Sequence, residues 1–138
     1  MVKFLLDTNV IAEIRKGTRA NPHVRAWFAP LDPDAILLSV VTIGEIRRGI
    51  ESVRRRDSDS ARALERWLVR LLRDHRDRIL RVDLRVAEQW GRLNVPDPLP
   101  VIDGLLAATA KVHGLTLATR NIKDVARSGA DVVNPFEP

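Results

Sequence analysis

The sequence predicts an α/β fold of the three-layer α/β/α sandwich type with a mostly parallel central sheet. Short apolar runs typical of strands buried on both faces alternate along the chain with longer segments of helical periodicity. Such alternation indicates βαβ units, in which helices cover both faces of the sheet. With 138 residues, 45% of them hydrophobic, we expect a single domain over residues 1–138 with one substantial core.

The first half of the chain begins with a continuously apolar run at 3–6, which predicts a buried strand. The Asp7-Thr8 pair is a helix start signal, and apolar residues at helical spacing follow until Gly17 stops the helix. The same reasoning predicts a helix opened by Asn21 and Pro22, a strand at 36–38, a helix opened by Thr42 and a long amphipathic helix at 58–74.

The second half of the chain continues the alternation. The apolar run at 79–82 predicts a short strand, and Asp83 caps the next helix before the proline-rich turn VPDPLP. The segment beginning VIDGLLAATA predicts a helix over 101–113 that ends at Gly114. Strands are expected at 115–119 and 131–133.

Composition excludes several classes of protein. There are no cysteines, which excludes disulfides and thiolate metal sites, and no apolar run is long enough for a transmembrane helix. An aspartate inside the short apolar run near the N-terminus argues against a signal peptide, so we expect a soluble cytoplasmic protein. The net charge of +5 permits binding to nucleic acid, although a strong preference for arginine over lysine is also typical of a GC-rich genome.

Polar groups far apart in the sequence converge on one edge of the predicted sheet. Asp7 follows the first strand, and Glu45 lies in the first turn or so of the helix that leaves the second. Asp103 lies in the first turn of the helix that leads into the strand at 115–119, and Asn121 and Asp124 follow that strand. In open parallel sheets, ligands bind outside the carboxyl ends of the strands.

Each acid also has a purely structural explanation. Asp7 suits a helix cap, Glu45 suits an exposed ion pair with Arg47 or Arg48, and Asp103 suits the positive end of the helix dipole. The dipole alone does not explain why the only charge in VIDGLLAATA is placed there. The helix is apolar nearly all round, so we expect it to be buried, and a buried carboxylate without a partner is costly. Several carboxylates at one edge would also raise one another's pKa.

A divalent cation resolves this conflict between the acids. Oxygen ligands favour Mg²⁺, with Mn²⁺ as a substitute, over Zn²⁺, and the three histidines fall at unrelated positions. A carboxylate-bound Mg²⁺ is typical of phosphate chemistry. A basic protein with such a site suits a nuclease.

Five segments, in order, resemble a PIN-domain ribonuclease of the VapC-type toxin class. They are LLDTNVI at 5–11, TIGEIRRGI at 42–50, VIDGLLAATA at 101–110, LATRNIKDV at 117–125 and VVNPF at 132–136. The resemblance covers essentially the whole chain. It implies a PIN-like sandwich and a Mg²⁺-dependent endoribonuclease.

The resemblance also implies roles for individual residues. Asp7, Glu45 and Asp103 would form the acidic triad that holds Mg²⁺. Part of the family has an acid where this chain has Asn121, and other members have an acid three residues later, which makes Asp124 our candidate fourth acid. The number of metal ions is left open.

Supporting roles are expected for residues beside the acids. Thr8 and Thr119 would position a water by hydrogen bonding, and Asn121 would support the acids. Arg15 and Arg120 are candidates for holding the RNA backbone, whereas Asn9 is expected to shape the turn.

The family also implies a VapB-type antitoxin as partner and a homodimer. We expect exposed apolar residues of the helix at 58–74 to contact the antitoxin.

Three alternatives remain open from the sequence. An aspartyl-nucleophile phosphatase fits LLDTN but normally has a second aspartate where this chain has Asn9. A non-catalytic PIN module would bind RNA or protein only, and a processing PIN nuclease would act on RNA or DNA without a toxin role.

Overall fold

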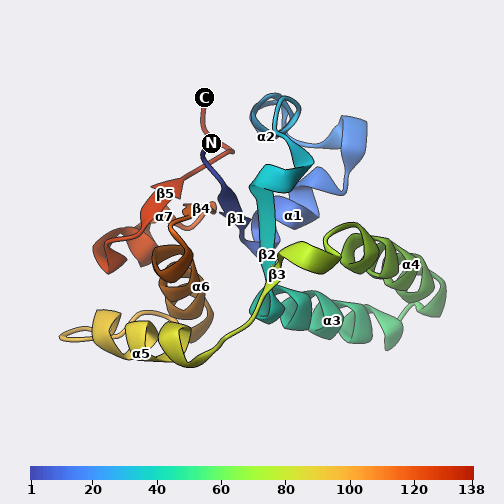
Figure 1. Cartoon of the computed structure of the whole chain (residues 1–138). Helices are drawn as coiled ribbons and strands as arrows, with labels where there is room; N and C mark the ends of the chain where they lie inside the picture. Colours follow the sequence, from blue (N-terminus) through green and yellow to red (C-terminus); the bar gives the residue numbers. More distant parts are fainter.

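A five-stranded parallel sheet forms the centre of the computed structural model, which describes residues 1–138 (Figure 1). The strand order is β3-β2-β1-β4-β5, and every neighbouring pair is parallel. The strands are β1 (Phe4–Leu6), β2 (Ile36–Ser39), β3 (Ile79–Leu80), β4 (Thr116–Ala118) and β5 (Asp131–Val133). The predicted α/β sandwich is confirmed, and the sheet is parallel throughout.

Helices cover both faces of this sheet (Figure 1). One side has α1 (Thr8–Ile14), α2 (Pro22–Phe28), α3 (Val40–Arg54) and α4 (Ser58–Asp74), and the other has α5 (Leu84–Leu93), α6 (Val101–His113) and α7 (Ile122–Val125). Adjacent residues of β1 point to opposite faces, so Leu6 packs in the core under α1, α3 and α4 while Leu5 packs against α6. None of the helices has the length and hydrophobicity needed to cross a membrane.

Most helix boundaries follow the signals in the sequence. The Asp7 side chain accepts from the Thr8 amide at the start of α1, and Asn21 caps α2. The long helix spans 58–74 as predicted, and α6 ends at Gly114, whose φ of 64° is the left-handed conformation that glycine adopts without strain.

Other boundaries differ from the prediction. Helix α3 begins at Val40, not at Thr42, because the Ser39 hydroxyl caps it by accepting from the Val41 amide. Glu45 therefore lies in the second turn of α3. Three strands are shorter than expected: β1 excludes Lys3, β3 ends at Leu80, and β4 is limited to 116–118, whereas β2 extends one residue further, to Ser39. The short helix α7 was not predicted.

Candidate active site

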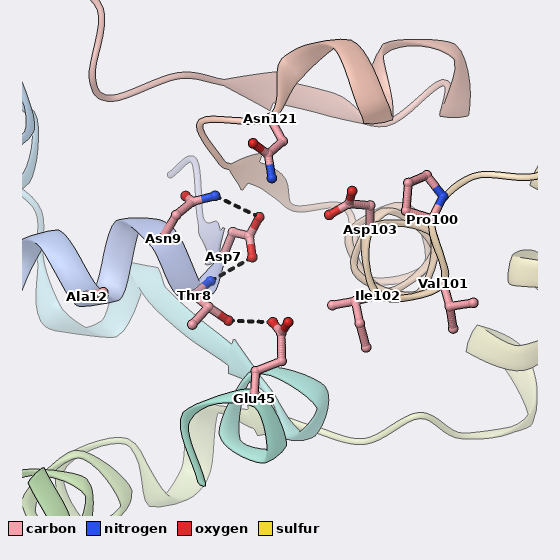
Figure 2. Close-up of a pocket in the computed structure, with 10 residues that line it drawn as sticks. All are labelled: Asp7, Thr8, Asn9, Ala12, Glu45, Pro100, Val101, Ile102, Asp103 and Asn121. Atoms are coloured by element: carbon pink, nitrogen blue, oxygen red, sulfur yellow. Dashed lines mark hydrogen bonds between the residues drawn. The ribbon is translucent and has the colours of Figure 1, made fainter. Parts of the chain in front are cut away.

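A cavity of about 530 Å³ opens at the carboxyl edge of the sheet (Figure 2). It is lined by residues from four separate segments: the start of α1, the second turn of α3, the first turn of α6 and the turn after β4. The lining residues are Asp7, Thr8, Asn9, Ala12, Glu45, Pro100, Val101, Ile102, Asp103 and Asn121. The parallel sheet thus brings together three acids that are distant in the sequence.

Asp7 is the most buried of these acids, with 5% of its surface exposed. One carboxylate oxygen accepts from the Thr8 amide at 2.7 Å, and the other accepts from the Thr119 hydroxyl at 2.7 Å and from the Asn9 amide group at 3.3 Å. Burial raises the pKa of Asp7, these hydrogen bonds oppose that rise, and the charge of Glu45 adds to it. The predicted cap exists, but it occupies only one of the two oxygens.

Glu45 is fixed by Thr8 across the cavity. The Thr8 hydroxyl donates to the Glu45 carboxylate at 2.6 Å (Figure 2). The alternative pairing of Glu45 with Arg47 is wrong, because Arg47 instead forms ion pairs with Glu51 and Glu65. Arg48 has no carboxylate within ion-pair distance. Glu45 therefore forms no ion pair, and its carboxylate lines the cavity.

Asp103 lies in the first turn of α6 and is only half-buried, which corrects the expectation of a buried acid. The first three residues of the helix are all at least partly exposed, and Gly104 is its first buried residue. Loss of hydration nevertheless raises the pKa of Asp103 to about 6, with further contributions from the charges of Asp7, Asp124 and Glu45. The acids are therefore close enough to repel one another.

The two candidates for a fourth position differ in placement. Asn121 lines the cavity, and Figure 2 shows its side chain directed toward the space between Asp7 and Asp103. Asp124 is exposed on α7 and does not line the cavity, although its charge acts on Asp103. Of the two candidates for the fourth position, the one that lines the cavity is therefore an amide and not an acid.

The two threonines hold the acids themselves. The Thr8 hydroxyl donates its hydrogen to Glu45, and the Thr119 hydroxyl donates its hydrogen to Asp7. The Thr119 oxygen also accepts from the backbone N–H of Asn121 at 3.0 Å. Positioning of a water, the role predicted from the sequence, would use the hydroxyl oxygens as acceptors, because each hydroxyl hydrogen already has an acceptor.

Asn9 contributes more than the sequence suggests. Its side chain donates to Asp7 and accepts from the Arg120 amide at 3.2 Å, which ties α1 to the turn after β4. The only signal in the sequence was its position two residues after Asp7. A pairing with a partner 111 residues away leaves no local pattern.

The two candidate RNA-binding arginines do not line the cavity. The Arg120 guanidinium lies 4.0 Å from the ring centre of Phe136, and the Arg15 guanidinium lies 5.6 Å from that of Trp67. Neither forms an ion pair with a carboxylate, so both charges remain available at the surface.

Contacts with α5 set the position of the first turn of α6. A Cβ atom on Gly104 would lie 3.2 Å from the indole nitrogen of Trp90, so a larger residue would require Trp90 to move by a few tenths of an ångström. The Asn94 side chain donates to the Trp90 carbonyl and accepts from the Leu99 amide, which holds the connection between the helices. Sequence reasoning linked neither Trp90 nor Asn94 to the site, because both contact the start of α6 and not the acids.

The donor set matches a hard divalent cation. The acids supply only oxygen, and their mutual repulsion, visible in the raised pKa of Asp103, is the conflict that a cation would relieve. No three acidic or histidine side chains are close enough here to hold one ion together, so ligation by all three acids requires them to approach one another.

Comparisons with known proteins agree with this geometry. The PIN domain family model matches residues 4–127. The chain is 30% identical to VapC ribonuclease Y4jK of Sinorhizobium fredii, with 97% of this chain and 98% of that protein covered, and 32% identical to Toxin FitB of Neisseria gonorrhoeae, with 96% and 97% covered. The crystal structure of FitAcB from Neisseria gonorrhoeae superposes with a TM-score of 0.89 at 31% identity over 98% of this chain and 99% of that chain. The chain belongs to the PIN-domain family.

Proposed function

We infer that this protein is a metal-dependent endoribonuclease that hydrolyses RNA phosphodiester bonds and is the toxin of a toxin–antitoxin pair. The observation that carries this is the meeting of Asp7, Glu45 and Asp103 around one cavity at the carboxyl edge of the sheet. Relatives that match nearly the whole chain are named as a VapC ribonuclease and as a toxin. The relatives match nearly the whole chain, which favours one PIN domain over 1–138. An RNA substrate favours action in the cytoplasm.

Asp7, Glu45 and Asp103 would hold Mg²⁺, for which Mn²⁺ would substitute. PIN-domain ribonucleases depend on a divalent metal ion. When bound, such an ion supplies Lewis acidity toward water and the phosphate oxygens. Thr119 orients Asp7, and Thr8 orients Glu45, so each acid faces the cavity before any ligand arrives.

The side chain of Asn121 would donate hydrogen bonds to substrate or water inside the cavity. Asp124 would act from outside it, through its charge on Asp103. Arg120 and Arg15 would hold RNA phosphates at the border of the site, each oriented by an aromatic ring.

The antitoxin would occupy an apolar groove that begins at the acids. The groove runs from Thr8 and Glu45 between α1, α3 and α4 to Leu64 and Trp67. The apolar residues of α4 on this groove, Leu64 and Trp67, are half-buried and not exposed as expected from the sequence. Val69 is the one large apolar side chain exposed on the helix, and it does not line the groove. An antitoxin chain in this groove would reach the acids and block them.

We also propose a homodimer. The exposed apolar side chains Leu84, Val95 and Val101 all lie on α5, the turn after it and the start of α6. Such residues are frequent in contacts between identical subunits.

The geometry disfavours the rival functions. Both carboxylate oxygens of Asp7 accept hydrogen bonds, which lowers the nucleophilicity that an aspartyl phosphatase needs. A non-catalytic module would not need three acids that repel one another around a cavity. A processing nuclease would use the same site, so the geometry does not distinguish it from a toxin. Toxicity that is lost when an antitoxin is co-expressed would identify the protein as a toxin.

The test is cleavage of total RNA by the purified protein with Mg²⁺, with Mn²⁺ or with EDTA. An Asp103→Asn variant should lose metal-dependent cleavage, whereas Asp97→Asn, a matched change at an exposed acid outside the cavity, should retain it. Equal cleavage by wild type and Asp103→Asn would refute the proposed site.

A further inference from the structure

We propose that the outer face of α4 binds the phosphate backbone of RNA at a distance from the acidic cavity. This face is formed by Arg62, Arg66, Val69, Arg70 and Arg73. The inference rests on the proposed ribonuclease function and adds a second contact with the same substrate.

The positive charge of this protein is concentrated in one segment. Residues 47–78 contain 11 of the 23 basic and 6 of the 18 acidic side chains, so this segment alone carries the whole net charge of +5. The remaining 12 basic and 12 acidic residues balance. A genome-wide preference for arginine would replace lysine along the whole chain but would not concentrate uncompensated charge on one helix pair.

Ion pairs neutralise only part of this segment. Glu51 and Glu65 bridge Arg47 and Arg54, which joins α3 to α4. Six arginines of the segment have no carboxylate within ion-pair distance, and they are Arg48, Arg55, Arg56, Arg66, Arg70 and Arg76. Four of these six charges gather in two places, with Arg55 and Arg56 at the turn between the helices and Arg66 and Arg70 on the outer face of α4, while Arg48 lies in α3 and Arg76 follows α4.

Arg66 and Arg70 are the centre of the outer face. They are one turn apart and exposed, on the side of α4 opposite the buried Leu68. The rise of four residues is about 6 Å, which is close to the spacing of successive phosphates along a nucleic acid strand. A shallow hollow of about 410 Å³ beside them is lined by Arg62, Glu65, Arg66, Val69 and Arg70. The Glu65 carboxylate is already paired with Arg47 and Arg54.

The acidic cavity makes a separate binding surface necessary. Asp7, Glu45 and Asp103 repel phosphate, so the cavity alone adds little affinity for RNA. Arginines that release counterions from the backbone supply affinity without selecting a base. The antitoxin groove lies on the inner side of α4, which leaves the outer face available to RNA.

The experiment compares wild type, Arg66→Gln/Arg70→Gln and a matched control, Arg85→Gln/Arg92→Gln, which removes two exposed charges from α5. Binding of transfer RNA is measured in EDTA from 50 to 300 mM salt, and cleavage of transfer RNA and of a short single-stranded oligonucleotide is measured with Mg²⁺. The α4 variant should bind transfer RNA roughly tenfold more weakly, with a salt slope smaller by about 1.5, because each lost phosphate contact removes about 0.7–0.9 from the slope. Its cleavage of the short oligonucleotide should be unchanged.

Equal losses in the α4 variant and the control would overturn the proposal, since net charge alone would then explain the effect. An unchanged salt slope in the α4 variant would overturn it as well, while the proposed function would stand on cleavage by wild type. Absence of cleavage of any RNA by wild type would overturn the proposed function and this inference with it.

Discussion

Removing the charge of Asp103 should stabilise the metal-free protein. The pKa of Asp103 is raised from 3.8 to about 6, so its carboxylate ionises less readily in the folded than in the unfolded chain. Below pH 3.8 the group is protonated in both states and has no effect. As the pH rises toward 6 the unfolded state gains the advantage, and above 6 the full penalty opposes folding.

The magnitude follows from the shift. About two pKa units correspond to roughly 3 kcal/mol at full effect, and solvent screening of a half-exposed side chain reduces this to about 1–2 kcal/mol. For a domain of this size Asp103→Asn should raise the Tm by about 3–6 °C at pH 7.5 in EDTA. The gain should vanish near pH 4.

Thermal unfolding of wild type, Asp103→Asn and Asp97→Asn between pH 4 and 8 measures this effect. Addition of Mg²⁺ should raise the Tm of wild type and have less effect on Asp103→Asn, because the variant lacks one ligand. A gain in Tm that is the same at pH 4 and pH 7.5, or no gain at pH 7.5, would show that the acids do not repel one another as the geometry indicates.

Two further predictions concern the supports of the site. Thr119→Val removes the hydroxyl that donates to buried Asp7 and should lower the free energy of unfolding, measured in urea, by about 1–3 kcal/mol. The control Thr109→Val loses only a hydrogen bond within α6 and should lower it by less than half as much. Equal losses in the two variants would contradict a special role of Thr119 at the acid. Gly104→Ala should lower the free energy of unfolding by about 1–2 kcal/mol and reduce cleavage, because the new methyl group meets Trp90. The control Gly91→Ala adds its methyl group in open space and should raise the free energy of unfolding by about 0.5–1 kcal/mol. If Gly104→Ala is stabilising, the packing of α5 on α6 is looser than the structure indicates.

The sequence predicted the elements whose signals are local. Alternation of apolar runs with helical periodicity led to the parallel sheet, and from the sheet the positions of Asp7, Glu45 and Asp103 at one edge followed from topology alone. The predicted start of α3 at Thr42 was wrong because Ser39 and Thr42 are both good N-cap residues, and the sequence around them does not choose between the two. The choice between them depends on pairing of Ser39 with Leu80 in the sheet, which no local pattern contains.

Exposure and long-range hydrogen bonds could not be predicted in the same way. The apolar run around Asp103 suggested burial, but exposure depends on which distant segments cover the first turn of α6, and this turn lines the open cavity. The bond from Thr119 to Asp7 joins residues 112 apart, and the contact of Trp90 with Gly104 depends on the packing angle between two helices. Composition likewise gave the net charge of the chain but not its concentration in residues 47–78.

That segregation of charge has a kinetic consequence. The acidic cavity needs a bound cation, whereas RNA that binds to the basic face of α4 releases cations. Added salt should therefore affect the two surfaces in opposite directions. Monovalent salt should therefore weaken RNA binding and raise KM with little change in kcat, because it competes for phosphates at α4. Divalent metal should act mainly on kcat, because it is needed where Asp7, Glu45 and Asp103 meet. A single surface serving both capture and hydrolysis would instead show KM and kcat changing together under either treatment.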